Sequence, residues 1–382
     1  MLISLHLSAA FDTIDHTILL SRLQTSFDIS GLALGWFHSY LESVFVCIDC
    51  STSSVTLRTT GVPQGSVFGP MLFPLFISPI AHIVSSYGLL QQQYADDTQL
   101  YIATSKDNYD TPVAKLELCL STLHTWFCYY GLALNSDKSE AIVFGTTQCS
   151  RSLSITSTVN VAGTLVQVSN QVRILGVNLD SRLSIDAHIS ALSKSSFCHI
   201  RALRHIRPNL TLDCSKNITC SLVGCCVDYA NSTLVGISFQ NISRLQRLQS
   251  TLTHVVTCQR ERTSIFKTLQ ELHWLPIKWC IDCKIATLTY KLLKSGEPAY
   301  PRSRITSKIS RRALRSSADD RQLKPCSSHT KLDHAPFVVP NRQYGTACRM
   351  TLELNHLALS FEADSKCTFQ DCHLTSYFGF KC

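Results

Sequence analysis

Apolar residues recur along the chain with two periods, one typical of strands and the other typical of helices. Residues 2–7 predict a strand, and Asp15 is placed to cap the helix that follows it. A second helix is predicted over 32–43, and strand-like runs follow at 44–49 and 54–60. The chain therefore opens with mixed strands and helices.

The later part of the chain is predicted to be mainly helical. A helix over 113–130 has apolar residues at helical spacing and ends at Gly131, and a turn and a strand follow it within 132–145. Beyond residue 190 an apolar stripe recurs at helical spacing, with Arg244 and Arg247 on another face of the same helix. The residues of the stripe are Leu245, Leu248, Leu252 and Val255.

The stretch QQQYADDTQLYIA places two adjacent carboxylates, Asp96 and Asp97, before a strand-like run over 98–102. Two neighbouring charges repel each other, and burying either one is costly unless a positive group compensates it. An exposed turn would make the pair harmless. The strand-like flanks favour instead a hairpin tip that binds divalent cations through carboxylate oxygens.

Charge is distributed unevenly along the chain, whose net charge is +8. Residues 1–150 hold 5 Lys and Arg against 12 Asp and Glu, whereas residues 241–330 hold 17 against 6. An acidic part joined to a basic part suits a protein that holds metal ions at one end and a polyanion at the other. A merely solvated basic face explains the charge equally well.

The 18 cysteines show no regular spacing, so we expect mostly free thiols in a reducing compartment. The tail over 367–382 lacks the paired spacing of a zinc site. The apolar segment 67–84 contains three prolines and predicts a buried core helix rather than a membrane span. With no signal peptide apparent, we expect an intracellular protein of the nucleus or cytoplasm that is not secreted.

Chemistry at the carboxylate pair would need partners from other segments. A two-metal phosphoryl-transfer site takes carboxylates from at least two strands, because adjacent side chains on one strand face opposite ways. The loop GVPQGS, residues 61–66, would let backbone approach a nucleotide, and Lys138 is a candidate cation near the leaving phosphate.

Five segments in this order resemble the palm motifs of a reverse transcriptase: AAFDTIDH, GVPQGSVFGPMLF, YADDTQLY, LNSDKSEAIVFG and ILGVNLDSRLSIDAHI. The chain is most similar to the non-LTR (LINE-type, jockey-like) retrotransposon enzymes, and the resemblance covers residues 1 to about 350. It implies an α+β fold, with a palm of antiparallel strands packed on helices over 1–190. A helical thumb would span 191–295, and a basic linker and divergent tail would span 296–382.

The resemblance also implies roles for individual residues. Asp96 and Asp97 match metal-binding carboxylates, and Lys138 matches a lysine that helps protonate pyrophosphate. Leu175 and Gly176 fall in the primer-grip strand pair, and Arg244 and Arg247 would contact the nucleic-acid backbone. Phe11 matches the aromatic residue under the sugar, while Gln64 and Gly65 line the nucleotide pocket. Phe11 as ordinary core and Lys138 as a solvated lysine are the alternatives.

The implied ligands are Mg²⁺, with Mn²⁺ as the alternative, and an RNA template, a DNA primer and dNTP. No membrane and no other small-molecule cofactor is expected. The chain departs from the family at the first metal ligand, where DLSAAFD becomes HLSAAFD and His6 replaces an aspartate. A neutral imidazole offers one nitrogen, whereas Mg²⁺ prefers oxygen. We expect the metal site to be impaired.

Met1 lies five residues before His6, so we also expect a truncated, partly degenerate element that lacks most of the fingers. Three functions compete. The first is an RNA-directed DNA polymerase by descent, and the second is a non-catalytic nucleic-acid-binding remnant, in which the basic thumb still binds duplex. The third is a secreted cysteine-rich interaction protein, which four glycosylation sequons and the cysteines favour and the missing signal peptide opposes.

Overall fold

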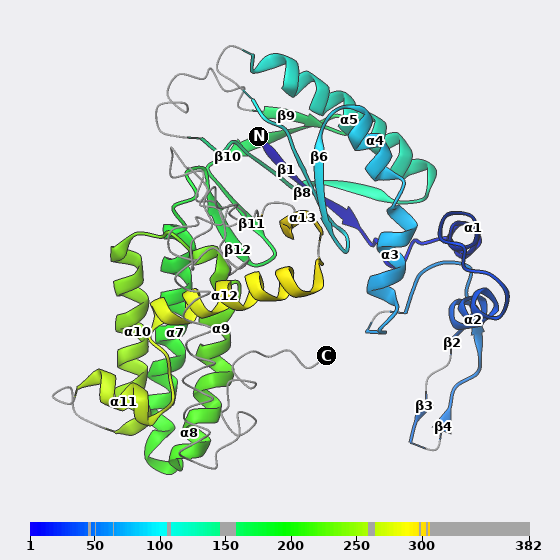
Figure 1. The fold of residues 1–382 in the computed structure, drawn as a ribbon. Coiled ribbons are helices and arrows are strands. Elements are labelled where there is room, and N and C mark those ends of the chain that lie inside the picture. The colour runs from blue at the N-terminus through cyan, green and yellow to red at the C-terminus, as the bar shows by residue number, and fades with distance from the viewer. Residues whose placement is uncertain are drawn as a thin grey trace, which may run out of the picture. The chain divides into compact units, whose positions relative to one another are not determined.

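The computed structural model describes residues 1–44, 47–49, 51–63, 65–104, 108–145, 158–258, 264–297, 299–302 and 305. The chain forms two compact units, Met1–Ile174 and Leu175–Cys382. In the described residues the first unit is a sheet with helices and the second is mainly helical (Figure 1). This is the α+β fold that the sequence predicts. The domain limits at residues 190 and 295 remain predictions.

The first unit is built on a six-stranded sheet in the order β6-β7-β1-β8-β10-β9. The predicted first strand, β1 (Leu2–Ser8), lies inside this sheet and is antiparallel to both β7 and β8. One pair departs from the predicted antiparallel pattern, because β10 runs parallel to β8. The other strands are β6 (Leu90–Tyr94), β7 (Asp97–Tyr101), β8 (Ala133–Ile142), β9 (Thr158–Val161) and β10 (Thr164–Ser169).

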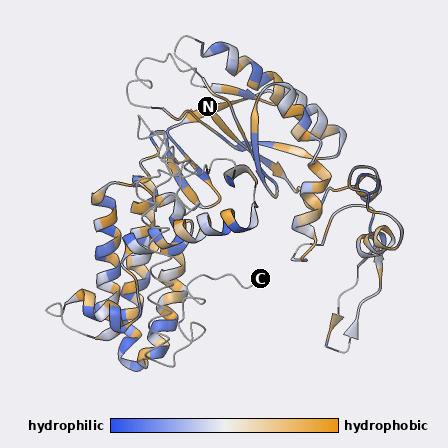
Figure 2. Cartoon of the chain, viewed as in Figure 1, coloured by the Kyte–Doolittle hydropathy of each residue, from blue (hydrophilic) through white to orange (hydrophobic). Residues whose placement is uncertain are grey.

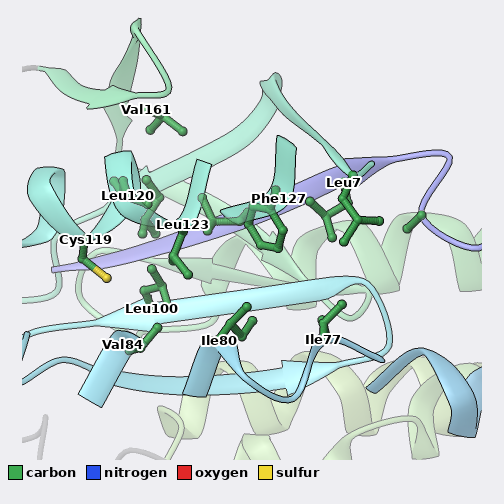
Figure 3. Close-up of a cluster of buried hydrophobic side chains, with 14 of the residues drawn as sticks. Leu7, Ile77, Ile80, Val84, Leu100, Cys119, Leu120, Leu123, Phe127 and Val161 are labelled. Carbon is green, nitrogen blue, oxygen red and sulfur yellow. The ribbon is translucent and has the colours of Figure 1, made fainter. Parts of the chain in front are cut away.

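The core of the first unit lies between the sheet and two helices, α4 (Ile80–Ser86) and α5 (Asp110–Tyr129) (Figure 3). Leu7 and Leu100 extend from the strands toward Leu123 and Phe127 of α5. Each large apolar side chain that is fully buried in this way contributes about 1.5–3 kcal/mol. The helix predicted over 113–130 is α5, and Gly131 follows it with a φ of 73°.

Three helices precede α4 in the first unit: α1 (His16–Phe27), α2 (Gly31–Glu42) and α3 (Gly69–Ile77). Asp15 caps α1 as predicted, and its carboxylate accepts a hydrogen bond from the Ile18 backbone at 2.9 Å. In the described residues after α2 there are four two-residue strands, namely β2 (Ser43–Val44), β3 (Cys47–Ile48), β4 (Ser51–Thr52) and β5 (Thr56–Leu57), and β4 lies between the two predicted strand-like runs.

The apolar segment over 67–84 forms two helices, α3 and α4, rather than the single helix predicted, and the apolar face of each is buried in the core. Phe73 and Phe76 of α3 and Ile80 of α4 are each 0% exposed. In the described part of the chain, no single helix has the length and apolar character to cross a membrane. Together, α3 and α4, which are bent by 41° relative to each other, are long and apolar enough to cross a membrane on length and composition alone.

The second unit contains the predicted helical region. In α10 (Phe239–Thr257) all four residues of the predicted apolar stripe are buried. Figure 2 shows that α7 and α10 carry both hydrophobic and hydrophilic residues, as helices that cover a core do. The remaining elements are β12 (Val177–Asp180), α7 (Asp186–Ile206), η1 (Arg207–Asn209), α8 (Leu212–Thr219), η2 (Cys220–Gly224), α9 (Cys225–Asp228), η3 (Asn231–Leu234), α11 (Ile265–Glu271), α12 (Ile277–Ser295) and α13 (Ala299–Arg302).

The cysteines for which the structure gives a state are free thiols. The tail over 367–382, and nearly all of the predicted linker and tail over 296–382, lies outside the described residues.

Candidate active site

The two carboxylates of YADD lie at the tip of the β6–β7 hairpin, as predicted. Ala95 and Asp96 form the turn, and Asp97 is the first residue of β7, paired with Tyr94. Ala95 takes a left-handed φ of 52°, so the turn forms without the glycine that such a turn usually contains. The two carboxylates therefore have different backbone environments, because Asp96 belongs to the turn and Asp97 to the sheet.

His6 of β1 lies opposite Asp97 of β7. The pairing of Leu5 with Thr98 places the next residue on each strand, His6 and Asp97, side by side on the same face. Nδ1 of His6 lies 3.3 Å from Oδ1 of Asp97, and the two side chains are 32% and 27% exposed. His6 thus contacts the carboxylate that lies across from it on β7.

The pKa of Asp97 is raised above its ordinary value. Burial is the main cause, because it disfavours the charged form, and the neighbouring Asp96 adds to it by repulsion. His6 acts in the opposite direction and favours the ionised Asp97. The contact with His6 therefore partly offsets the effect of burial on the pKa of Asp97.

On its other side β1 pairs with β8, which carries Lys138. The sequence predicts a turn and then a strand here, and this is wrong in detail, because 133–142 is one strand interrupted by a bulge. The register slips between the pairs of Ser4 and His6, and within the slip Lys138 N–H donates to Asn135 Oδ1 at 3.2 Å. A bulge re-aims side chains at the end of a strand. The side chain of Lys138 is exposed.

The candidate nucleotide loop, residues 61–66, is hydrogen-bonded to the residues that follow β1. Val62 N–H donates to the Phe11 carbonyl at 2.8 Å, and Gly61 N–H donates to the Ile14 carbonyl at 2.8 Å. Phe11 is half-buried with its ring centroid 5.1 Å from that of Phe73, so it contacts the core and keeps a partly exposed surface. Gly65 has a φ of 79°, and Gln64 lies outside the described residues.

His16, the first residue of α1, contacts this loop, and the sequence predicted no role for it. It is 7% exposed, and its Nε2 lies 2.6 Å from the Gly61 carbonyl oxygen. Its backbone N–H also donates to the Thr59 carbonyl at 3.0 Å. His16 thereby holds the start of the GVPQGS loop against α1. The available signal was its place directly after the capping Asp15 in AAFDTIDH.

The other predicted site residues, namely Leu175, Gly176, Arg244 and Arg247, belong to the second unit. Leu175 and Gly176 form the turn between β11 (Gln171–Ile174) and β12, rather than lying within the strands. On α10 Arg244 is half-buried and Arg247 is exposed, with its Nε donating to the Ser243 carbonyl at 3.3 Å.

Comparison with known proteins identifies the fold. Residues 1–179 match the family described as reverse transcriptase (RNA-dependent DNA polymerase). The chain is 26% identical over 258 residues to the probable RNA-directed DNA polymerase from transposon BS of Drosophila melanogaster. This alignment covers 65% of this chain and 28% of that protein. It is 25% identical over 259 residues to the polymerase from mobile element jockey of the same fly, covering 64% and 27%.

The chain spans less than a third of the length of these curated relatives. Among solved structures, apo telomerase from Candida tropicalis aligns over 71% of this chain and 45% of that one, with 12% identity and a TM-score of 0.36. Residues 1–179, which contain all of the sheet of the first unit, are thus similar to the reverse transcriptase family. Over about two thirds of its length, the chain is similar to the polymerases of transposon BS and of the mobile element jockey.

Reverse transcriptases use divalent metal ions, and the residues at the hairpin fit such ions poorly. Asp96 and Asp97 supply oxygens, but His6, which lies across from Asp97, supplies an imidazole nitrogen that contacts the Asp97 carboxylate. Hard cations such as Mg²⁺ prefer oxygen ligands. Within the described ranges, no group of three or more His, Cys, Asp or Glu side chains is arranged to hold a metal ion.

Proposed function

We propose that this chain is an RNA-directed DNA polymerase domain by descent, whose nucleotidyl transfer is impaired by His6. Its substrates would be an RNA template, a DNA primer and dNTP, and its cofactor Mg²⁺ or Mn²⁺. The contact of 3.3 Å between His6 and Asp97 carries this proposal. A group that is cationic when protonated lies where the family has a carboxylate, and it takes up the oxygen that an ion would need.

In this proposal the other residues keep their family roles. Asp96 and Asp97 remain the metal-binding carboxylates, and Lys138 remains the proton donor to the leaving pyrophosphate. Phe11 and Gly65, together with Gln64, would form the nucleotide pocket. The hydrogen bonds from Gly61 and Val62 to the chain after β1 support this arrangement, because they hold the loop beside Phe11.

The test is dNTP incorporation on a primed RNA template, with Mg²⁺ and then Mn²⁺, by the natural chain and by His6→Asp. Asp97→Asn, which lacks one of the two carboxylates, serves as the inactive reference. We expect His6→Asp to incorporate dNTP, and the natural chain to incorporate no more than Asp97→Asn does. The matched control His6→Asn supplies an oxygen ligand without a charge, and we expect it to fall between the two.

A second readout does not need catalysis. Metal that binds only the folded protein raises its unfolding temperature, so Mg²⁺ should stabilise His6→Asp and leave the natural chain unchanged. Robust Mg²⁺-dependent synthesis by the natural chain would refute the role given to His6. Failure of every variant to incorporate dNTP would favour the non-catalytic nucleic-acid-binding remnant.

A further inference from the structure

The turn between β11 and β12 has a backbone that a leucine rarely adopts. Leu175 has a φ of 45° and Gly176 a φ of 80°, so both residues are left-handed. Two-residue hairpin turns of this kind favour Asn or Asp followed by Gly, because a side chain at the first position is strained. Such backbone strain persists only where the surrounding structure holds it.

Tyr229 holds this turn. Its hydroxyl donates a hydrogen bond to the Leu175 carbonyl oxygen at 2.6 Å. Its ring also lies against Gly176, since a Cβ built on that glycine would come 3.5 Å from Cε1 of Tyr229. The side chain thus contacts both residues of the turn while remaining 55% exposed.

Tyr229 is itself presented by a well-bonded corner of the second unit. It directly follows α9, and its N–H donates to the Cys225 carbonyl at 2.9 Å. The next residue, Ala230, is left-handed with a φ of 50°, and its carbonyl accepts from both the backbone N–H and the hydroxyl of Thr233 at 2.9 and 2.8 Å. Immediately before α9, η2 is a π-helix, a feature that occurs often at functional sites.

We propose that Tyr229 is a positioning residue for the primer strand, which fixes the Leu175–Gly176 turn so that its backbone contacts the sugar-phosphate of the primer terminus. The proposal rests on the proposed function and on the primer-grip role that the resemblance to reverse transcriptases implies for these two residues. Contacts to phosphate and sugar fix the position of a nucleic-acid strand on the protein. A turn that is held in one conformation therefore fixes the primer in one position, whereas a turn that changes conformation would allow several.

The test uses Tyr229→Phe, which removes only the hydroxyl, with Tyr290→Phe as the matched control, because Tyr290 is a similarly exposed tyrosine of the second unit at 51%. Amide hydrogen exchange at Gly176 and Val177 should become about fivefold faster in Tyr229→Phe, the loss expected for one hydrogen bond. Binding to a DNA primer recessed on an RNA template, followed by fluorescence anisotropy, should weaken about fivefold as well. Tyr290→Phe should change neither quantity.

A blunt RNA–DNA duplex of equal length separates this inference from the proposed function. If the natural chain binds the recessed and blunt duplexes equally, recognition of a primer terminus fails, and the primer part of this inference fails with it. If the natural chain prefers the recessed end and Tyr229→Phe keeps that preference, Tyr229 does not position the primer. Unchanged exchange at Gly176 would show that Tyr229 does not hold the turn.

Discussion

At the scale of single residues, Gly61 fixes where the candidate nucleotide loop begins. Its φ is 84°, and a Cβ at this position would lie 3.1 Å from the backbone oxygen of Asp12. Only glycine both adopts this conformation easily and lets the two backbones approach so closely. The hydrogen bonds from Gly61 N–H to Ile14 and from His16 to the Gly61 carbonyl depend on that approach.

We predict that Gly61→Ala lowers the free energy of unfolding by about 1–3 kcal/mol more than Gly163→Ala does. Gly163 has nearly the same φ, 85°, but within the described residues a Cβ there would meet no heavy atom within 4 Å. The strain of the left-handed backbone is therefore common to both variants, and the close contact belongs to Gly61 alone. Urea unfolding of the two variants measures the difference, and equal losses would contradict the prediction.

Elements with a regular period could be predicted from the sequence, whereas contacts between elements could not. The periodicity of β1 and of α5 is a local property, which can be recognised from the sequence of that segment alone. The bulge in β8 and the contact between His6 and Asp97 depend on register, which only the assembled sheet defines. Motif spacing thus indicated candidate site residues but not which of them contact one another.

Arg22 illustrates the same limit. It is 8% exposed, and its guanidinium carbon lies 5.1 Å from the ring centroid of Phe76 and 4.9 Å from that of Tyr130. A charged residue in a helical pattern predicts an exposed position, because most arginines remain in contact with water. The aromatic rings that surround it come from other elements, α3 and the end of α5, and the sequence of α1 does not indicate them.

The loop before α7 depends on one carboxylate, that of Asp180. It accepts hydrogen bonds from the backbone N–H of Arg182 at 3.0 Å, of Ser184 at 3.0 Å and of Ile185 at 2.8 Å, and from the Ser184 hydroxyl at 2.9 Å. Burial by itself would raise the pKa of Asp180, but the hydrogen bonds outweigh burial and lower it. The folded state therefore favours the ionised carboxylate.

We predict a pH-dependent stability contribution from Asp180. A pKa that is lower in the folded state gives stability that is full above the unfolded value of about 4 and is lost as the pH falls through the folded value. Asp180→Asn should lower the free energy of unfolding by about 1 kcal/mol between pH 5 and 8, and the difference should shrink below pH 4. The control Asp213→Asn changes an exposed carboxylate of α8. A difference that grows on acidification would contradict the prediction.

At the scale of the whole molecule, the charges are separated along the chain. The excess of acidic residues lies in 1–150, where the carboxylate hairpin is, and the excess of basic residues lies in 241–330, which includes most of α10. A polyanion is held mainly through released counterions, so each contact between a basic side chain and a phosphate adds to the salt dependence of binding. If the chain binds nucleic acid as proposed, the basic part should set that dependence.

We predict that Arg244→Ala/Arg247→Ala reduces the slope of log affinity against log salt by about 2 for an RNA–DNA duplex. The matched control Arg58→Ala/Lys115→Ala removes the same charge from exposed residues in the acidic part and should leave the slope unchanged. Fluorescence anisotropy over a series of salt concentrations measures both slopes. An equal reduction in the two double variants would mean that binding follows net charge rather than the position of α10, and the backbone role of Arg244 and Arg247 would then be wrong.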